Sequence, residues 1–249
     1  MTITLKCERK IAYTSPDHIM PHGTRRDNSK NPRFNAKLYQ LYKKPIKILD
    51  LGCSGGGFVK ECIDDGNFAI GLEGSDYSKK MKRAEWRTIP EYLYTCDITR
   101  NFDLYENSSR IKFNVITAWE VLEHINEKDL KVLINNMKKH LSDDGLIITS
   151  VANKSDIING IELHQTQKPK EWWINRFSKA GLKYMPQYIQ YFNTQYIRYK
   201  YETAEQFHMI FAKIDAKPPL PPKEQLLSRV LDRWKGSRIQ SILSDILTN

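Results

Sequence analysis

A short apolar strand that runs directly into a glycine-rich turn is the feature that most restricts how this chain can fold. Residues 46–51 lead into Gly52-Cys53-Ser54-Gly55-Gly56-Gly57, and the pattern that follows predicts an amphipathic helix over residues 57–65. Glycines in such a turn let backbone N–H groups come close to a ligand, and the N-terminus of the next helix carries partial positive charge. The turn is typical of a nucleotide cradle, although glycine-rich strings also form ordinary tight turns.

An acidic residue downstream strengthens this interpretation. The apolar run 68–72 ends in Glu73, roughly 20 residues after the turn, where a carboxylate at a strand end of a doubly wound sheet accepts both ribose hydroxyls of a nucleoside. A dehydrogenase would need the spacing G-x-G-x-x-G around a pyrophosphate, and the turn lacks it. The pattern therefore disfavours a dehydrogenase.

Apolar runs and helical segments alternate along most of the chain. This alternation predicts an α/β fold with a doubly wound, parallel sheet and right-handed crossovers. Two further apolar stretches, within residues 182–192 and 206–214, are expected to be the last strands of the sheet, joined by an aromatic-rich loop. The expected parallel strands are residues 46–51, 68–73, 92–97, 113–119 and 145–151, and the later helices are residues 127–140 and 170–180.

Several motifs in this region resemble those of the class I S-adenosylmethionine-dependent methyltransferases. They occur in that family's order and spacing and cover about residues 46–151: the turn 50–56, the strand end 71–75, Cys96-Asp97-Ile98, the segment 113–125 and the segment 141–148. Ser54 departs from the glycine usual in this turn, but a small side chain still permits the turn. The resemblance implies a Rossmann-like sheet whose last two strands form an antiparallel hairpin, and S-adenosyl-L-methionine as cofactor.

The resemblance also implies which residues bind the cofactor. The turn would surround the methionine part and the ribose, Glu73 would hold the ribose hydroxyls, Asp97 would accept from the adenine amino group, and Trp119 or Glu120 would line the methionine end. For Asp97 the alternative is a turn or helix cap. The full expected set is Asp50, Gly52, Cys53, Ser54, Gly56, Glu73, Gly74, Ser75, Asp97, Ile98, Trp119 and Glu120.

Three residues are candidates for the catalytic base. His164 follows the fifth expected strand, in a loop that in related methyltransferases reaches over the acceptor, and its ordinary pKa near 6.5 suits it to take a hydroxyl proton. The alternative is a histidine that is only hydrogen-bonded in a loop. His124 and Glu120 are the other candidates, although the matching family histidine is often structural. Glu123 beside His124 suggests a metal pair, but nothing else lies at metal-ligand spacing, so no metal is expected.

A finer similarity concerns the acceptor. Residues 71–78, Arg83-Ala84-Glu85-Trp86 and His164 followed by Trp172-Trp173 resemble a subgroup of bacterial methyltransferases that accompany surface-glycan biosynthesis. This similarity favours O-methylation of a sugar hydroxyl or another small polar acceptor, with or without an attached phosphate or nucleotide. Polar residues of the N-terminal segment would then hydrogen-bond the acceptor.

The formal charge of +10 suggests polyanionic partners, but its distribution weakens that interpretation. Residues 1–45 hold ten Lys and Arg against three acidic residues, residues 213–249 hold seven against four, and the part between is neutral. The basic segments could attract nucleic acid, an anionic membrane surface or a charged glycan, or they could simply be solvated lysines. Because the chain shows no RNA-binding motif, nucleic acid is not expected, and an RNA- or protein-directed methyltransferase is the alternative. A non-catalytic fold is the third hypothesis.

The cysteines and the chain ends suggest location and organisation. Four cysteines without paired zinc or disulfide spacing suggest a reducing compartment, and no apolar run approaches the roughly 20 residues that span a bilayer, so a cytoplasmic protein is expected. Residues 1–45 are expected to be a leader or a lid over the site, residues 46–214 the methyltransferase domain, and residues 215–249 a proline-rich connector and a terminal helix. The apolar stripe of that helix would pack on its own core by default, with a second subunit or a membrane surface as the alternatives.

Overall fold

The computed structural model describes residues 2–192 and 202–223, and its centre is a seven-stranded sheet. The five strands in the order β4-β3-β2-β7-β8 are parallel, and β12 lies antiparallel between β8 and β11. This is the doubly wound, mostly parallel sheet with an antiparallel hairpin that the sequence predicts. The strands are β2 (Lys47–Leu51), β3 (Phe68–Glu73), β4 (Leu93–Thr95), β7 (Phe113–Trp119), β8 (Leu141–Ala152), β11 (Leu182–Tyr184) and β12 (Gln206–Lys213).

The strand order reverses beside β2, which pairs with β3 on one side and with β7 on the other. In open α/β sheets, ligands bind at the carboxyl ends of the strands next to such a reversal. The sequence that follows β2, β3 and β7 therefore forms the binding site.

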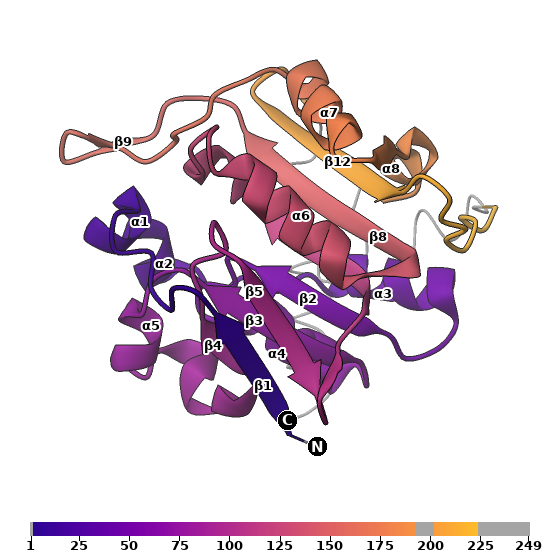
Figure 1. Ribbon diagram of the computed structural model, residues 1–249, viewed down its shortest axis with the longest axis horizontal. Coiled ribbons are helices and arrows are strands. Elements are labelled where there is room, and N and C mark those ends of the chain that lie inside the picture. Colours follow the sequence, from indigo (N-terminus) through magenta and orange to yellow (C-terminus); the bar gives the residue numbers. More distant parts are fainter. Residues whose placement is uncertain (1, 193–201, 224–249) are drawn as a thin grey trace, which may run out of the picture.

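Helices cover both faces of the sheet and create two apolar cores. On one face, α6 (Leu130–His140) and α7 (Lys170–Lys179) bury Leu133, Met137 and Phe177; Figure 1 shows α6 lying across the sheet. On the other face, α3 (Pro32–Tyr42), α4 (Gly57–Asp64) and α8 (Pro186–Phe192) form the second core. Strands of the central sheet are buried on both sides, which explains their continuous apolar runs.

The expected strand over residues 182–192 is wrong in its second half. Only Leu182–Tyr184 is a strand, and a helix begins at Pro186. Tyr188, Tyr191 and Phe192 are all buried, and their spacing of three and four residues is the helical period, which places the three rings on one face. Aromatic residues are common in strands, but here Tyr188, Tyr191 and Phe192 form the buried face of a helix.

The N-terminal segment contains more structure than its polar sequence suggests. A small second sheet joins β1 (Ile3–Cys7) to β5 (Phe102–Glu106), which also pairs with β6 (Ser109–Arg110). Then α1 (Pro16–Ile19) and α2 (His22–Arg26) precede α3, whose Phe34 is fully buried. Figure 1 shows α1 and α2 at the same end of the molecule as the short hairpin of β9 (Ile157–Ile158) and β10 (Ile161–Glu162).

The remaining described elements are short. They are α5 (Tyr77–Lys80) and three 3-10 turns, Ala84–Arg87, Pro90–Tyr92 and Leu122–His124. Within residues 2–192 and 202–223, no helix is both long and apolar enough to cross a bilayer. The expected terminal helix, and with it the surface that its apolar stripe packs on, falls outside the described residues.

Tyr42 connects α3 to the beginning of β7 in the central sheet. Its hydroxyl donates to the backbone carbonyl of Asn114 at 3.1 Å, and burial raises its pKa. We expect Tyr42→Phe to lower the free energy of unfolding by about 0.5–1.5 kcal/mol, because a carbonyl loses its buried donor. Urea titration measures this loss. Tyr39→Phe, on the exposed face of α3 where Tyr39 is 67% exposed, is the matched control and should change nothing; an equal loss in both variants would contradict the assignment.

Candidate active site

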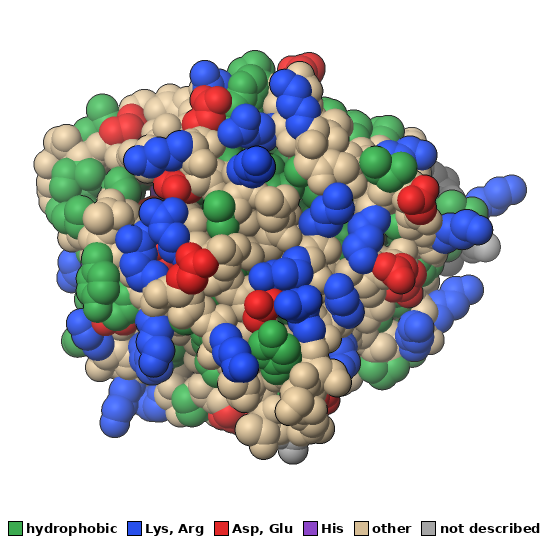
Figure 2. Space-filling view, in the orientation of Figure 1, with side chains coloured by type: hydrophobic (Ala, Val, Ile, Leu, Met, Phe, Trp, Pro, Cys, Tyr) green, Lys and Arg blue, Asp and Glu red, His purple; other side chains and the backbone are tan. Residues whose placement is uncertain are grey.

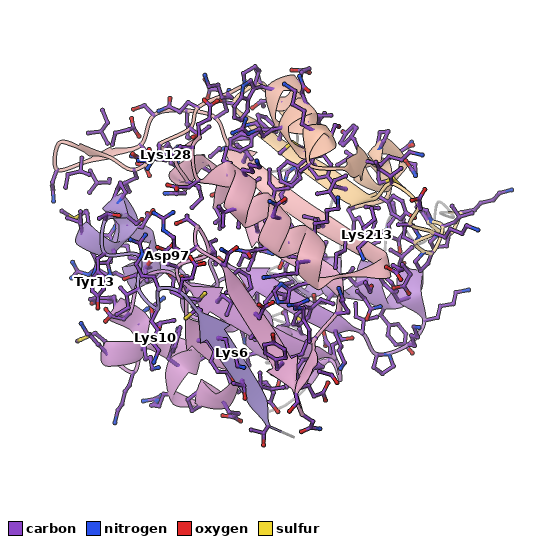
Figure 3. The ribbon with its side chains drawn as sticks, in the orientation of Figure 1. Lys6, Lys10, Tyr13, Asp97, Lys128 and Lys213 are labelled. Carbon is purple, nitrogen blue, oxygen red and sulfur yellow. The ribbon has the colours of Figure 1, made fainter. Side chains whose placement is uncertain are left out.

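A large cavity lies at the carboxyl ends of β2, β3 and β7. Its volume is about 650 Å³, within the range of small-molecule sites. Figure 3 labels Asp97 and Lys128, two of the residues that line it. Its walls come from the glycine-rich turn, the end of β3, the segment 97–100, the residues after β7, the N-terminal segment and the loop after β8. A smaller cavity of about 50 Å³ shares Asp27, Gly52, Trp119, Glu120 and Gln206 with it and is also lined by Asp50 and Cys53.

The glycine-rich turn is bent by residues with positive φ. Gly52 has φ +74°, and a side chain there would collide with Val121. Ser54 adopts φ +47°, so the serine permits the left-handed conformation that glycine usually supplies. Its N–H donates to Glu73 at 2.8 Å, and its hydroxyl donates to the carbonyl of Asp27 at 3.0 Å. The turn therefore holds both the acidic residue of β3 and the N-terminal segment.

The other glycines of the turn make room for the protein itself. A Cβ on Gly55 would lie 2.5 Å from the side-chain oxygen of Asn28, and one on Gly57 would collide with the Asn28 carbonyl. Gly56 has φ +87° and faces Leu93 rather than either cavity. The glycines of this turn were expected to make room for a ligand, but residues 27–29 of the protein approach Gly55 and Gly57 closely instead.

Glu73 is held in place at the wall of the large cavity. Its carboxylate is 6% exposed and accepts from the N–H groups of Ser54 at 2.8 Å and Ser75 at 2.9 Å. Burial raises its pKa despite these bonds. Each carboxylate oxygen has a second lone pair, so the group can still accept from ribose hydroxyls. Gly74 and Ser75 line the cavity beside it.

Asp97 is fully buried and already has protein partners. Arg9 donates from Nε to Oδ2 at 2.5 Å, and Thr99 donates to Oδ1 from its N–H at 3.0 Å and its hydroxyl at 2.6 Å. Asp97 thus caps a turn. It also lines the cavity, where its carboxylate can accept from an adenine amino group. Ile98 lines the same wall. Arg9 was not predicted as a partner of Asp97, because 88 positions separate the two residues in the sequence.

Trp119 and Glu120, at the end of β7, line both cavities, and Asp50, at the end of β2, lines the smaller one. Trp119 packs edge-on against Phe34, with ring centroids 4.9 Å apart. Glu120 has φ +51°, a conformation that costs energy outside glycine and often marks functional sites, and its N–H donates to the Ser150 hydroxyl at 3.0 Å. Asp50 accepts from the Thr117 hydroxyl at 2.7 Å, and burial raises its pKa to about 7.

The fold brings Glu123, His124 and His164 together. Glu123 and His124 belong to the turn after β7, His164 follows β10, and one potential ligand atom of each lies within 4.8 Å of the others. The two imidazole rings are nearly perpendicular, with centroids 4.7 Å apart. His124 and His164 line the large cavity. From the sequence, no metal is expected because no further ligand lies at metal-ligand spacing from the Glu123–His124 pair. The fold brings a further potential ligand, His164, close to that pair, so this reason no longer applies.

Each member of this cluster has a fixed protein contact. His164 donates from Nδ1 to the carbonyl of Lys154 at 2.5 Å, and burial and the neighbouring His124 lower its pKa. Asp17 of α1 lies 3.0 Å from Nδ1 of His124; it outweighs burial and raises the His124 pKa to about 9. Glu123 accepts from the Ala152 N–H at 2.7 Å, and burial raises its pKa to about 7. His164 is thus held neutral, with Nε2 available as a base.

The N-terminal segment lines the opposite wall of the cavity. Asp17, His18, His22 and Thr24 all contribute to it, and Thr24 also accepts through its carbonyl from the Ser78 hydroxyl at 3.3 Å. The segment therefore lies against the site, as a lid would.

A family comparison agrees with this architecture. Residues 22–211 match the family described as "Methyltransferase domain", which is more than half of the chain. The chain therefore belongs to this methyltransferase family, and S-adenosyl-L-methionine is its cofactor. The buried acceptor Glu73, the bent turn and a cavity of suitable size fit that nucleoside-containing cofactor.

Similar proteins are distant in sequence. The ubiquinone biosynthesis O-methyltransferases of Pelagibacter ubique and Glaesserella parasuis are 27% and 29% identical over 45% and 49% of this chain, which spans 44% and 51% of their lengths. The chain thus spans about half the length of these curated relatives. Two similar folds are the CcbJ methyltransferase of Streptomyces caelestis (TM-score 0.54, 10% identity, 82% and 99% coverage) and an S-adenosylmethionine-dependent methyltransferase of Clostridium acetobutylicum (TM-score 0.52, 14% identity, 79% and 96% coverage).

Proposed function

We propose that this methyltransferase acts on a hydroxyl group of a small polar acceptor, with a sugar or glycan as the first candidate. The observation that supports this most is the neutral His164 beside His124 and Glu123 at the wall of the large cavity, because a hydroxyl acceptor needs a base. The O-methyltransferase relatives favour the same chemistry.

The walls of the cavity suggest how the cofactor lies. Asp97 and Ile98 would receive the adenine, Glu73 the ribose hydroxyls, and Gly52 with Trp119 or Glu120 the methionine end. This order runs along the carboxyl ends of β4, β3, β2 and β7 and ends beside the cluster. The acceptor would then lie between the cluster and the N-terminal residues His18 and His22.

The chemistry required of the protein is mainly positioning. S-adenosyl-L-methionine carries its methyl group on a sulfonium, which is already activated for transfer. The cavity holds the acceptor oxygen in line, an effect that accounts for much of the rate in such reactions. The Nε2 atom of His164 takes the hydroxyl proton, and the carbonyl of Lys154 fixes the tautomer that leaves this nitrogen free.

Product analysis tests this proposal. The protein would be incubated with isotopically labelled S-adenosyl-L-methionine and separate pools of sugars, nucleotide-linked sugars, glycans and phenolic acceptors of ubiquinone biosynthesis, and the products analysed by mass spectrometry. We expect a labelled methyl ether in at least one hydroxyl pool. Transfer exclusively to nitrogen or to RNA would contradict the proposal.

The surface charge gives an independent prediction about nucleic acid. Figure 2 shows Lys and Arg side chains scattered among acidic ones rather than gathered in one basic groove on this face. We therefore expect no micromolar, steeply salt-dependent binding of structured RNA or of DNA in fluorescence anisotropy titrations at low and high salt. Tight, salt-sensitive binding of a structured RNA would instead favour the RNA-directed alternative.

A further inference from the structure

We propose that Glu123, His124 and His164 form a binding site for a divalent transition-metal ion of the Zn²⁺ type, with one coordination position open to the cavity. The existence of the site is independent of the proposed function. Its role in catalysis rests on that function, because the open position would receive the acceptor hydroxyl.

Three side chains supply a set of possible metal donors. One side-chain donor of each residue lies within 4.8 Å of the other two. Two donors bound to one tetrahedral Zn²⁺ lie about 3.3–3.6 Å apart, so side-chain adjustments of roughly 1 Å bring the three onto a common ion. The donors come from two loops that meet only in the folded chain, and both histidines border the cavity.

One carboxylate oxygen of Glu123 is buried without a hydrogen-bond partner among the described residues. The residue is 0% exposed, and its Oε1 accepts from the Ala152 N–H, whereas Oε2 has no hydrogen-bond partner among the described residues. Neither imidazole satisfies this atom, although both are adjacent. A buried carboxylate oxygen without a donor is costly and rare, and a cation is a partner that would offset the cost.

The other ring nitrogen of each histidine contacts the protein. His164 uses Nδ1 to donate to the Lys154 carbonyl, which leaves Nε2 as a ligand atom. His124 places Nδ1 3.0 Å from the carboxylate of Asp17, so the ion would bind its Nε2 in exchange for the proton that this nitrogen carries. Metal-binding histidines almost always contact a carboxylate or a backbone carbonyl through the other ring nitrogen, and this contact orients the ring. His164 has such a hydrogen bond, and His124 has an ion pair with Asp17 at the corresponding nitrogen.

The ligand chemistry selects the ion. Two imidazoles and one carboxylate suit Zn²⁺ or similar transition metals, whereas Mg²⁺ and Ca²⁺ prefer oxygen ligands only. Three protein ligands with an open position are typical of catalytic rather than structural zinc sites. The open position would face the cavity, where the acceptor is proposed to bind.

The open coordination position gives the ion a role in activating the acceptor hydroxyl. An acceptor hydroxyl oxygen that donates a lone pair to the ion has a lowered pKa, so its proton leaves to water and the oxygen becomes the nucleophile without any oxidation or reduction. In the metal-loaded enzyme, the ion would thus replace His164 as the group that promotes deprotonation, and His164 would act as its ligand.

Metal binding itself is the first measurement. The full chain would be stripped with a chelator and titrated with Zn²⁺ and with Co²⁺, in the absence of cofactor and acceptor. We expect about one equivalent bound per chain, with a visible Co²⁺ absorption band that indicates a low-coordinate site with nitrogen ligands. Failure of the folded chain to bind either ion would overturn the proposal.

Variants then locate the ion. Glu123→Gln and His164→Asn are each expected to weaken Zn²⁺ binding by more than tenfold, and Asp17→Asn by roughly 10–100-fold, because it removes the contact that orients His124. His22→Ala is the control, since this histidine borders the same cavity outside the cluster and should leave Zn²⁺ binding unchanged. Circular dichroism checks folding, and His164→Asn, in a loop, decides the matter if Glu123→Gln unfolds. Unchanged binding in the folded variants would place the ion elsewhere and overturn the assignment.

Activity separates this inference from the proposed function. If the ion activates the hydroxyl, chelation should lower O-methylation at least tenfold and Zn²⁺ or Co²⁺ should restore it. O-methylation that persists fully after chelation would overturn the catalytic role of the ion and leave the proposed function intact. Stoichiometric binding in a chain that methylates only nitrogen would support the site and contradict the proposed function.

Discussion

His164→Ala is expected to lower turnover by about 10²–10⁴-fold, the usual contribution of a positioned proton acceptor. His164 lies at the cavity wall, has its Nδ1 fixed by the Lys154 carbonyl and is kept neutral by burial. Because it lies beyond the residues expected to hold the cofactor, the affinity for S-adenosyl-L-methionine should remain nearly unchanged. Single-turnover kinetics and calorimetric titration measure the two quantities separately.

Two further variants test whether the loss of turnover in His164→Ala is specific to that side chain. Lys168→Ala changes the same loop, where the side chain is 42% exposed, and should leave turnover within about twofold. His124→Ala should impair folding or cofactor affinity more than His164→Ala, because His124 also contacts Asp17 of the N-terminal segment. A parallel loss of turnover and cofactor affinity in His164→Ala would contradict a role in deprotonation.

Glu73→Ala is expected to weaken the binding of S-adenosyl-L-methionine by about 1.5–3 kcal/mol, the usual range for hydrogen bonds to a charged group. That is a loss of roughly 10–150-fold in affinity. The structure adds a second consequence, because the carboxylate also accepts from the N–H groups of Ser54 and Ser75. The variant should therefore also be less stable, so calorimetry must be performed well below its unfolding transition.

The control for this prediction is Asp76→Ala. Asp76 lies three residues further along the chain, is 7% exposed and pairs with Lys80, but it does not line the cavity. Its removal should leave cofactor affinity unchanged. An unchanged affinity in folded Glu73→Ala would exclude Glu73 from the ribose position.

Much of the central sheet was predictable because its signals are local. Strands buried on both faces appear as continuous apolar runs, and the turn between residues 51 and 57 needs small or glycine residues that are visible in the sequence. The ends were less predictable: β8 begins at Leu141, four residues before the expected start, and its register with β7 shifts between Phe113 and Val115. Such shifts depend on the neighbouring strand.

The parts that sequence reasoning missed depend on long-range contacts. The pairing of β1 with β5 joins residues about 100 positions apart, and the alternating pattern of five residues in β1 is too short a signal. Arg9 reaches Asp97 only through that pairing. The position of His164 beside Glu123 was equally hidden, because 40 residues separate them and spacing along the chain shows only the Glu123–His124 pair.

The most direct test of the account is a crystal structure with bound S-adenosylhomocysteine. We expect the adenine beside Asp97 and Ile98, the ribose hydroxyls on Glu73, and the sulfur facing the space in front of His164. A sulfur atom remote from His164, with the imidazole turned away from the ligand and toward solvent, would contradict it. Glu120, His124 or a histidine of the N-terminal segment would then be the remaining candidates for the base.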